Sequence, residues 1–292
     1  STAQHREMLD QTMRICRVQP DHDLNLMRPN QSLSSFLSKL LIELEVLLRK
    51  VKPAMVLVQG DTHTAFGGAL AAFQQQIVIG HVEAGLRSGD KYNPFPEEMN
   101  RRLISNMADL HFAPTHRDKK NLLRENVQSE SIFVTGNTVI DNLLAVAAEE
   151  REVLRQHLPE IVFAEDRRVL LVTAHRRESF GVPMEQICRS LIEIIAEYPE
   201  VEVVFPVHLN PAVRGTVYSI LQGKDRIHLI EPLAYDAFVE AMGLAHLIIT
   251  DSGGVQEEAP VLGKPVLLIR ENTERQEGIA AGVVRQVGVA QD

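Results

Sequence analysis

The sequence predicts an α/β protein made of two Rossmann-like, doubly wound domains that face a cleft. Short apolar runs alternate with helix-like segments along all 292 residues, which is typical of parallel sheets with helical crossovers. Apolar residues make up 45% of the sequence, enough for two hydrophobic cores. Titratable residues follow several of the apolar runs, where open α/β sheets bind their ligands. We expect the two domains at residues 1–136 and 137–292.

Periodic apolar positions in the first half predict helices at residues 7–16 and 34–50. The second helix has a leucine-rich stripe from Phe36 to Leu48, which we assign to the core of the domain rather than to a subunit interface. Gly67 and Gly68 lie in a small-residue helix that can pack closely on a sheet. The other elements expected here are strands at 55–58, 77–79, 110–113 and 132–134, the small-residue helix at 65–73, and a helix that starts at Glu97.

The second half repeats the pattern after a long polar helix, which we expect to follow residues 136–141 and to run to about His157. An acidic linker at residues 159–168 follows, since no apolar period is present there. Strands are then expected at residues 169–173, 201–205, 227–230, 247–250 and 266–269, with helices between them.

One segment, residues 247–262, is the strongest candidate for a ligand site. It predicts a buried strand, a tight turn and a short helix. Gly253 and Gly254 let a ligand approach the backbone, Ser252 is placed to cap the helix, and the helix N-terminus favours a diphosphate. Glu258 follows about one turn later, where a carboxylate can accept hydrogen bonds from ribose hydroxyls. Taken alone, the segment is equally consistent with an ordinary βα loop and solvated glutamates.

Other strand ends also carry polar and titratable residues, which places a charged site at the carboxyl edges of the sheets. These residues are Asp61, His63, His81, Glu83, His175, Arg176, Arg177, His208 and Asp251. Each has a structural alternative: Asp61 could cap its helix, and Glu97 could simply complement a helix dipole. We expect no metal, because no compact third ligand group accompanies the two histidine and carboxylate pairs.

Composition excludes several classes of protein. A net charge of −9 and a pI near 5.7 argue against a nucleic-acid groove. Cys16 and Cys188 are far apart without metal-ligand spacing, which indicates a reduced, cytoplasmic protein. Neither a signal peptide nor an apolar run of about 20 residues is found, so we expect no membrane association. The first residues read as a strand end that enters a helix, so the sequence is expected to begin inside a domain.

A series of ordered strings resembles the non-hydrolysing bacterial UDP-N-acetylglucosamine 2-epimerases over essentially the whole chain. The strings are TAQHREMLD from Thr2, GDT from Gly60, GHVEAGLR from Gly80, PEE from Pro96, NR from Asn100, FVTGNTVID from Phe133, HRRESFG from His175, PVHLNP from Pro206, DSGGVQEEAP from Asp251, and TER from Thr273. The resemblance implies two Rossmann-like domains of the glycosyltransferase-B type. It also implies a homodimer and a cytoplasmic location.

The reaction implied by the resemblance is the reversible epimerisation of UDP-N-acetylglucosamine to UDP-N-acetylmannosamine at C2. UDP leaves C1 as the C2 proton is lost, which gives 2-acetamidoglucal, and UDP then adds back with protonation on the other face. No cofactor is needed. The product would feed surface polysaccharide biosynthesis.

Site residues follow from the resemblance position by position. Asp61, Glu83 and Glu97 match the carboxylates that act as acid and base, and His175 matches a histidine beside the diphosphate. The substrate-binding positions are Phe238 beside the uracil, Ser252, Gly253 and Gly254 in the phosphate loop, Glu258 on the ribose, and Arg275 as a further nucleotide contact. Positions of a second, regulatory UDP-N-acetylglucosamine site are matched by Gln4, Arg176 and His208, in addition to Glu97. Glu7 and Asn30 do not match the side chains of relatives regulated in this way, which puts the activation in doubt.

The resemblance also implies that the family's first strand, with its Gly-Thr-Arg-Pro-Glu loop, and its last helices lie outside these 292 residues. The sequence is then either a piece of a normal enzyme or a truncated protein that has lost activity. Two further function classes remain open. One is a UDP-sugar glycosyltransferase or hydrolysing epimerase of the same fold. The other is an inactive UDP-sugar binding protein.

Overall fold

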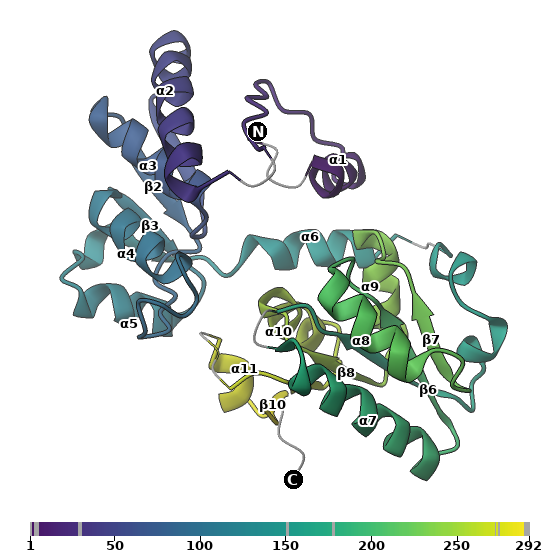
Figure 1. Cartoon of the computed structure of the whole chain (residues 1–292). Helices are drawn as coiled ribbons and strands as arrows, with labels where there is room; N and C mark the ends of the chain where they lie inside the picture. Colours follow the sequence, from purple (N-terminus) through teal and green to yellow (C-terminus); the bar gives the residue numbers. More distant parts are fainter. Residues whose placement is uncertain are drawn as a thin grey trace. The chain divides into compact units, whose positions relative to one another are not determined.

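The computed structural model of the chain describes residues 2, 6–28, 31–149, 152–176, 179–271, 273 and 275–288. The chain divides into two compact units, Ser1–Thr138 and Val139–Asp292. Each unit has its own parallel sheet with helices between successive strands (Figure 1). The predicted fold class, two α/β doubly wound domains, is therefore confirmed.

Unit 1 contains a four-stranded parallel sheet in the order β1-β2-β3-β4. Its strands are β1 Met55–Gln59, β2 Val78–Val82, β3 Leu110–Ala113 and β4 Ile132–Val134. Its helices are α1 Arg6–Ile15, α2 Leu33–Val51, α3 His63–Gln74, α4 Glu97–Met107, α5 His116–Arg124 and the 3-10 turn η1 Ser129–Ser131. All three strand pairings are parallel, so β1 and β2 end at the same edge of the sheet.

The predicted leucine-rich stripe of α2 packs inside unit 1, as expected for a core helix. Phe36, Leu40 and Leu48 are buried, whereas Ile42 and Val46 on the other side of the helix are exposed. Gly67 of α3 makes the close approach possible, since a Cβ atom there would lie 2.5 Å from Cδ2 of Leu40. The small residues of α3 are thus required by helix packing.

Unit 2 contains a six-stranded parallel sheet in the order β10-β9-β8-β5-β6-β7. Its strands are β5 Arg168–Thr173, β6 Val201–Pro206, β7 Ile227–Ile230, β8 Leu247–Thr250, β9 Val266–Leu268 and β10 Val284–Gln286. Its helical elements are α6 Thr138–Ala147, η2 Leu154–Gln156, η3 Glu160–Phe163, α7 Val182–Glu197, α8 Pro211–Leu221, α9 Tyr235–Leu244, α10 Gly253–Val261 and α11 Glu277–Ala280.

Strand β5 lies between β8 and β6, and the strand order reverses direction at this point. Thr173 pairs with Thr250 in the register of β5 and β8, and their hydroxyl oxygens are 2.7 Å apart. The two strands therefore end level with each other, at the switch point where doubly wound sheets bind ligands.

The expected long helix to His157 is wrong, because α6 ends at Ala147. The amide of Leu154 instead donates a hydrogen bond of 2.7 Å to the Glu240 carboxylate on α9, and the Leu154 side chain is buried. This tertiary contact holds residues 154–156 as a 3-10 turn. The expected acidic linker also contains a 3-10 turn, in which Val162 is buried.

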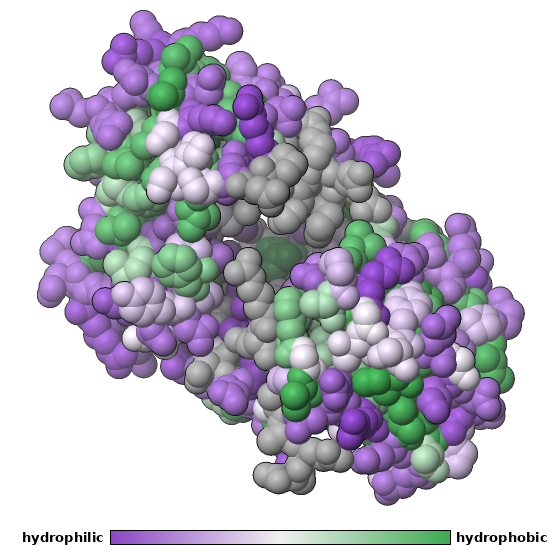
Figure 2. All heavy atoms as spheres, in the orientation of Figure 1, coloured by the Kyte–Doolittle hydropathy of each residue, from purple (hydrophilic) through white to green (hydrophobic). Residues whose placement is uncertain are grey.

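Polar and charged side chains cover most of the face of the chain seen in Figure 2, with apolar side chains scattered among them. In the described residues, no helix combines the length and the apolar character that crossing a membrane requires.

Candidate functional site

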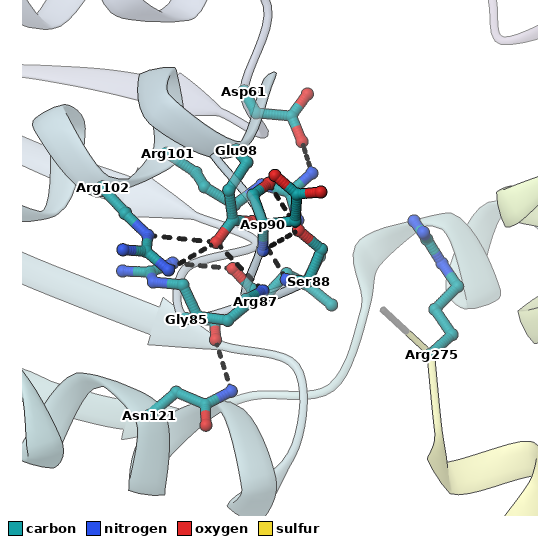
Figure 3. Close-up of polar contacts among 12 residues, drawn as sticks. Asp61, Gly85, Arg87, Ser88, Asp90, Glu98, Arg101, Arg102, Asn121 and Arg275 are labelled. Carbon is teal, nitrogen blue, oxygen red and sulfur yellow. Dashed lines mark hydrogen bonds and ion pairs between the residues drawn. The ribbon is translucent and has the colours of Figure 1, made fainter. Parts of the chain in front are cut away.

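In unit 1, Asp61 lies in the turn between β1 and α3. Thr62 caps α3, since its hydroxyl accepts a hydrogen bond from the amide of Ala65, so the cap is not made by Asp61. The Asp61 carboxylate instead faces Arg101 of α4, with Oδ2 2.5 Å from Nη2 (Figure 3). The amide of the Asn100 side chain donates to the Asp61 carbonyl at 2.8 Å. Two neighbouring residues of α4 therefore hold both the backbone and the side chain of Asp61.

Glu98 is a fully buried carboxylate that holds Arg101 and the loop before α4 in place. One Glu98 oxygen lies 3.6 Å from Nη1 of Arg101, and the other accepts a hydrogen bond of 3.0 Å from Nε of Arg102. The same carboxylate accepts hydrogen bonds from the backbone amides of Ser88 at 3.0 Å and Gly89 at 3.4 Å. A buried carboxylate needs this number of donors to compensate for its lost hydration.

Glu83 follows the end of β2, directly beside the turn that carries Asp61. Its backbone is in the left-handed region at φ 65°. A Cβ atom added at Gly60 would lie 3.5 Å from Oε2 of Glu83, so this carboxylate faces the Gly60 turn. The two carboxylates thus lie at the same edge of the parallel sheet.

Glu97 is the first residue of α4 and is half-buried. Its charge acts on His63, the first residue of α3: burial lowers the pKa of His63, and Glu97 partly opposes that effect. Glu97 is therefore close to the start of α3. Of the three carboxylates predicted as acid and base, Asp61 follows β1, Glu83 follows β2, and Glu97 begins α4, the helix that comes after β2.

His81 lies beneath this turn as a fully buried, neutral histidine. Burial lowers its pKa to about 4, with further lowering by His111, Arg87 and Arg101, although the contact with Gly60 opposes the shift. Its Nε2 is 2.9 Å from the Gly60 carbonyl, which can only accept, so this nitrogen carries the proton.

Among the described residues, no group of three His, Cys, Asp or Glu side chains is arranged to hold a metal ion.

In unit 2, His175 and Asp251 form a pair at the ends of β5 and β8. Nδ1 of His175 is 3.0 Å from Oδ1 of Asp251. The other carboxylate oxygen accepts hydrogen bonds from the amides of His175 at 2.8 Å and Arg176 at 2.9 Å, and from the Ser179 hydroxyl at 2.9 Å. Asp251 has no exposed surface, whereas the His175 side chain is 39% exposed. The arrangement leaves the His175 ring able to meet a ligand.

The surroundings of Asp251 favour its ionised form. Burial alone would raise its pKa, but the His175 imidazole and the amides of Arg176 and His175 outweigh burial and hold the pKa below its usual range. Asp251 therefore fixes the position of His175 as a buried anion.

Two of the predicted regulatory residues lie beside His175. The His208 ring stacks on the His175 ring with their centroids 5.6 Å apart. Nε of Arg176 donates to the Asp251 carbonyl at 3.0 Å. Gln4, the third residue of that prediction, lies outside the described residues. A regulatory role for these positions stays a prediction.

The turn after β8 opens α10 with two glycines, as predicted, but Ser252 does not cap the helix with its side chain. Its amide instead donates to the Thr250 hydroxyl at 2.9 Å. The guanidinium of Arg275 lies so close to Gly253 that an added Cβ would be 2.8 Å from Nη1. Glu257 forms an ion pair with Nε of Arg275 and holds it there. A helix N-terminus and a fixed guanidinium therefore meet at Gly253, an arrangement that suits an anionic group.

Glu258, one turn into α10, is 6% exposed. The hydroxyl of Tyr235, the first residue of α9, donates to its Oε1 at 2.9 Å. Burial raises the pKa of Glu258, as does the charge of Glu257, while the Tyr235 hydroxyl lowers it. Phe238 lies on the next turn of α9 and is half-buried.

Sequence reasoning singled out Asp251 as a strand-end residue without predicting its contact with His175. It assigned no role to Arg101 and Tyr235, which also contact predicted site residues, or to Glu98, which pairs with Arg101. Of these, Glu98, Arg101 and Asp251 are charged and almost fully buried, which is rare unless the charge has a partner. Glu98 and Arg101 are i, i+3 neighbours at the start of a predicted helix, a spacing that could have suggested a pair. The partners of Tyr235 and Asp251 are distant in sequence, so no local signal identifies them.

One protein family matches the chain over its whole length. The family model described as UDP-N-acetylglucosamine 2-epimerase matches residues 1–292. A UDP-N-acetylglucosamine 2-epimerase from Bacillus subtilis is 50% identical over 293 residues, which cover all of this chain and 75% of that protein.

Two solved structures are also similar. UDP-GlcNAc 2-epimerase from Neisseria meningitidis bound to UDP-GlcNAc aligns with a TM-score of 0.91 and 47% identity, over 98% of this chain and 78% of that one. The Methanocaldococcus jannaschii enzyme in complex with UDP-GlcNAc and UDP aligns with a TM-score of 0.83 and 36% identity, over 99% of this chain and 80% of that one.

Proposed function

Because the chain belongs to the UDP-N-acetylglucosamine 2-epimerase family, we propose that it interconverts UDP-N-acetylglucosamine and UDP-N-acetylmannosamine. The observation that carries this proposal is the turn after β8, where the start of α10 and the Arg275 guanidinium meet at Gly253. This turn offers backbone amides and a fixed positive charge to a diphosphate. Both kinds of contact stabilise UDP as it leaves and hold it until it adds back.

The chemistry assigned to unit 1 is proton transfer at C2 of the sugar. Elimination breaks the C1–O bond to UDP and the C2–H bond, and leaves 2-acetamidoglucal with a C1=C2 double bond. Return of UDP to C1 with a proton delivered to the opposite face of C2 completes the inversion. Proton transfer on both faces of C2 requires more than one positioned acid or base. Carboxylates at one sheet edge are supplied by Asp61, Glu83 and Glu97.

His175 is assigned to the departing UDP oxygen. Asp251 contacts Nδ1 of His175, so Nε2 is the nitrogen that can face a ligand, and it donates to the UDP oxygen when the ring is protonated on both nitrogens. A buried carboxylate behind an imidazole fixes the tautomer and the ring orientation, as in other acid-base pairs. No cofactor is part of this scheme.

Two further parts of the proposal are the assembly and the location. We expect a homodimer, and apolar side chains such as Met99 and Leu103, one turn apart on the exposed face of α4, are available for an interface. A cytoplasmic location is consistent with Cys16 and Cys188, which are not joined in a disulfide. Size-exclusion chromatography with light scattering tests the assembly, and a monomeric mass at micromolar concentration would contradict it.

Incubation with UDP-N-acetylglucosamine in deuterium oxide tests the function. The epimerase assignment requires UDP-N-acetylmannosamine with deuterium at C2 and no net release of UDP. Stoichiometric release of UDP would instead indicate a hydrolysing epimerase or a glycosyltransferase. Binding of UDP without deuterium incorporation would indicate an inactive binding protein.

A further inference from the structure

The contact between Tyr235 and Glu258 joins two helices of unit 2 that follow different strands. Tyr235 begins α9, which precedes β8, and Glu258 lies in α10, which follows it. The Tyr235 hydroxyl donates to Oε1 of Glu258 at 2.9 Å. The rest of the Glu258 side chain is enclosed, since the residue is 6% exposed. A single phenol therefore meets a buried carboxylate at one of its two oxygens.

The second oxygen, Oε2, faces the turn that opens α10. A Cβ atom added at Gly254 would lie 3.7 Å from Oε2, so this oxygen is beside the backbone of the glycine turn. Within the described part of the chain, no hydrogen bond reaches Oε2. The two oxygens of one carboxylate thus have different surroundings, one held by Tyr235 and one directed toward Gly254.

The hydrogen bond from Tyr235 stabilises the ionised form of Glu258. A carboxylate is acceptor-only, and accepts the strongest hydrogen bonds, while it is ionised. Burial and the neighbouring Glu257 raise the pKa of Glu258, and the Tyr235 hydroxyl lowers it. Without this donor, the buried carboxylate would lose a stabilising hydrogen bond and would be protonated at higher pH.

We propose that Tyr235 is a positioning residue for nucleotide recognition, which holds Oε1 of Glu258 so that Oε2 accepts a hydrogen bond from a ribose hydroxyl. This inference rests on the proposed function, in which Glu258 binds the ribose of UDP. Tyr235 then contributes to the selection of a ribonucleotide without touching it. Its loss should weaken the binding of ligands that carry ribose hydroxyls and leave the binding of ligands without them unchanged.

The experiment compares UDP with 2′,3′-dideoxy-UDP by calorimetry in Tyr235→Phe, Glu258→Gln and the double variant. Both ligands carry the same diphosphate, so the ratio of their dissociation constants reports the ribose contact alone. For the unaltered protein we expect UDP to bind roughly tenfold or more tightly than the dideoxy ligand, the size of a hydrogen bond to a charged group. Tyr235→Phe should lower this ratio severalfold, and adding it to Glu258→Gln should change nothing further.

The pH dependence distinguishes positioning from a loss of structure. The ribose contact is stronger with ionised Glu258 than with the protonated form, so the ratio falls as pH decreases through the pKa of Glu258. Because Tyr235 lowers that pKa, Tyr235→Phe should move the midpoint of this fall to higher pH. Tyr198→Phe, at a 45% exposed tyrosine after α7, is the matched control and should leave ratio and midpoint unchanged.

The outcomes separate the two proposals. A ratio that falls in Glu258→Gln but stays unchanged in Tyr235→Phe would overturn the role of Tyr235 and leave the proposed function intact. An unchanged ratio in Glu258→Gln would remove the ribose role of Glu258 and this inference with it. Failure of UDP to bind to the unaltered protein would count against the proposed function itself.

Discussion

Nη2 of Arg101 lies 2.5 Å from Oδ2 of Asp61, and the same guanidinium reaches the buried carboxylate of Glu98 through Nη1 at 3.6 Å. One arginine therefore connects a predicted catalytic carboxylate to the carboxylate that holds the Ser88 loop. The planar guanidinium can meet both partners at once, which the single ammonium of a lysine cannot do.

Replacement of Arg101 by Lys should therefore lower turnover while the KM for the UDP-sugar changes little. We expect a fall in kcat of roughly tenfold or more, because the carboxylate that transfers the proton loses its fixed position. Steady-state kinetics in both directions measure the effect. Arg102→Lys is the control, since the Arg102 side chain pairs with Glu98 and is 36% exposed. Equal effects of the two substitutions would contradict the prediction.

The variants Asp61→Asn, Glu83→Gln and His175→Ala should each reduce turnover by at least ~100-fold, the usual size of an acid-base contribution. The amide variants keep the shape of the side chain and remove its ability to carry the proton. Deuterium exchange at C2, measured by NMR, reports the proton transfer directly. Near-normal exchange in all three variants would refute the site assignment.

Gly253→Ala should weaken UDP binding by roughly tenfold, the loss of one good charge-assisted contact. The added methyl group would lie 2.8 Å from Nη1 of Arg275, so the guanidinium must move away from Glu257 and from the start of α10. Calorimetry with UDP measures the loss. In an Arg275→Ala background, the same substitution should cost much less.

Gly243→Ala provides the matched control for this substitution. Gly243 lies in α9, and an added Cβ would meet nothing within 4 Å. An alanine in a helix is favoured over glycine by roughly 0.5–1 kcal/mol, so this variant should bind UDP normally and unfold at a slightly higher temperature. A similar loss of UDP affinity in both variants would show that Gly253 has no special role.

Stability should fall at mildly acidic pH because His81 is buried in its neutral form. Its pKa is lowered from 6.5 to about 4, so the unfolded chain binds a proton over this range and the folded chain does not. The free energy of unfolding is unaffected by this histidine above pH 6.5. It falls by about 3 kcal/mol as the pH decreases to about 4, because the unfolded chain takes up the proton first.

Urea midpoints between pH 8 and pH 4 measure this loss for the unaltered protein and for His81→Gln. The variant should be less sensitive to pH over this range, because glutamine does not titrate and its amide can still donate to the Gly60 carbonyl. His157→Gln, at an exposed histidine, should keep the pH dependence of the unaltered protein. Identical curves for His81→Gln and the unaltered protein would contradict the assignment.

Much of the fold could be predicted because buried parallel strands leave a direct signal in the sequence. The strands at 227–230 and 247–250 were predicted with the bounds of β7 and β8, since each is an apolar run between polar segments. The 3-10 turn after α6 could not be predicted, because Leu154 contacts Glu240, 86 residues away. Local propensity does not report such a contact.

The candidate site residues also divide into those that a local sequence pattern indicates and those that depend on contacts between distant parts of the chain. The rule that ligands bind beyond strand ends directed attention to Asp61, Glu83, His175 and the glycine turn. The rule also indicated Asp251, but it did not indicate Arg101 or Tyr235, which hold other site residues in place. Arg101 and Tyr235 contact partners 40 and 23 residues away, and the tertiary packing of the chain brings these pairs together.

The pairing of Thr173 with Thr250 has a consequence for protein engineering. His175 and Asp251 are 76 residues apart, yet each lies just beyond one of these paired threonines. Insertions or deletions in the connections between the two strands should therefore leave the histidine and aspartate in contact. Deletion of a single residue within β8 would shift Asp251 by about 3.3 Å and turn the following side chains to the opposite face. Grafted loops are thus best placed in those connections between β5 and β8 that carry no residue of the candidate site, and the two strands themselves are best left intact.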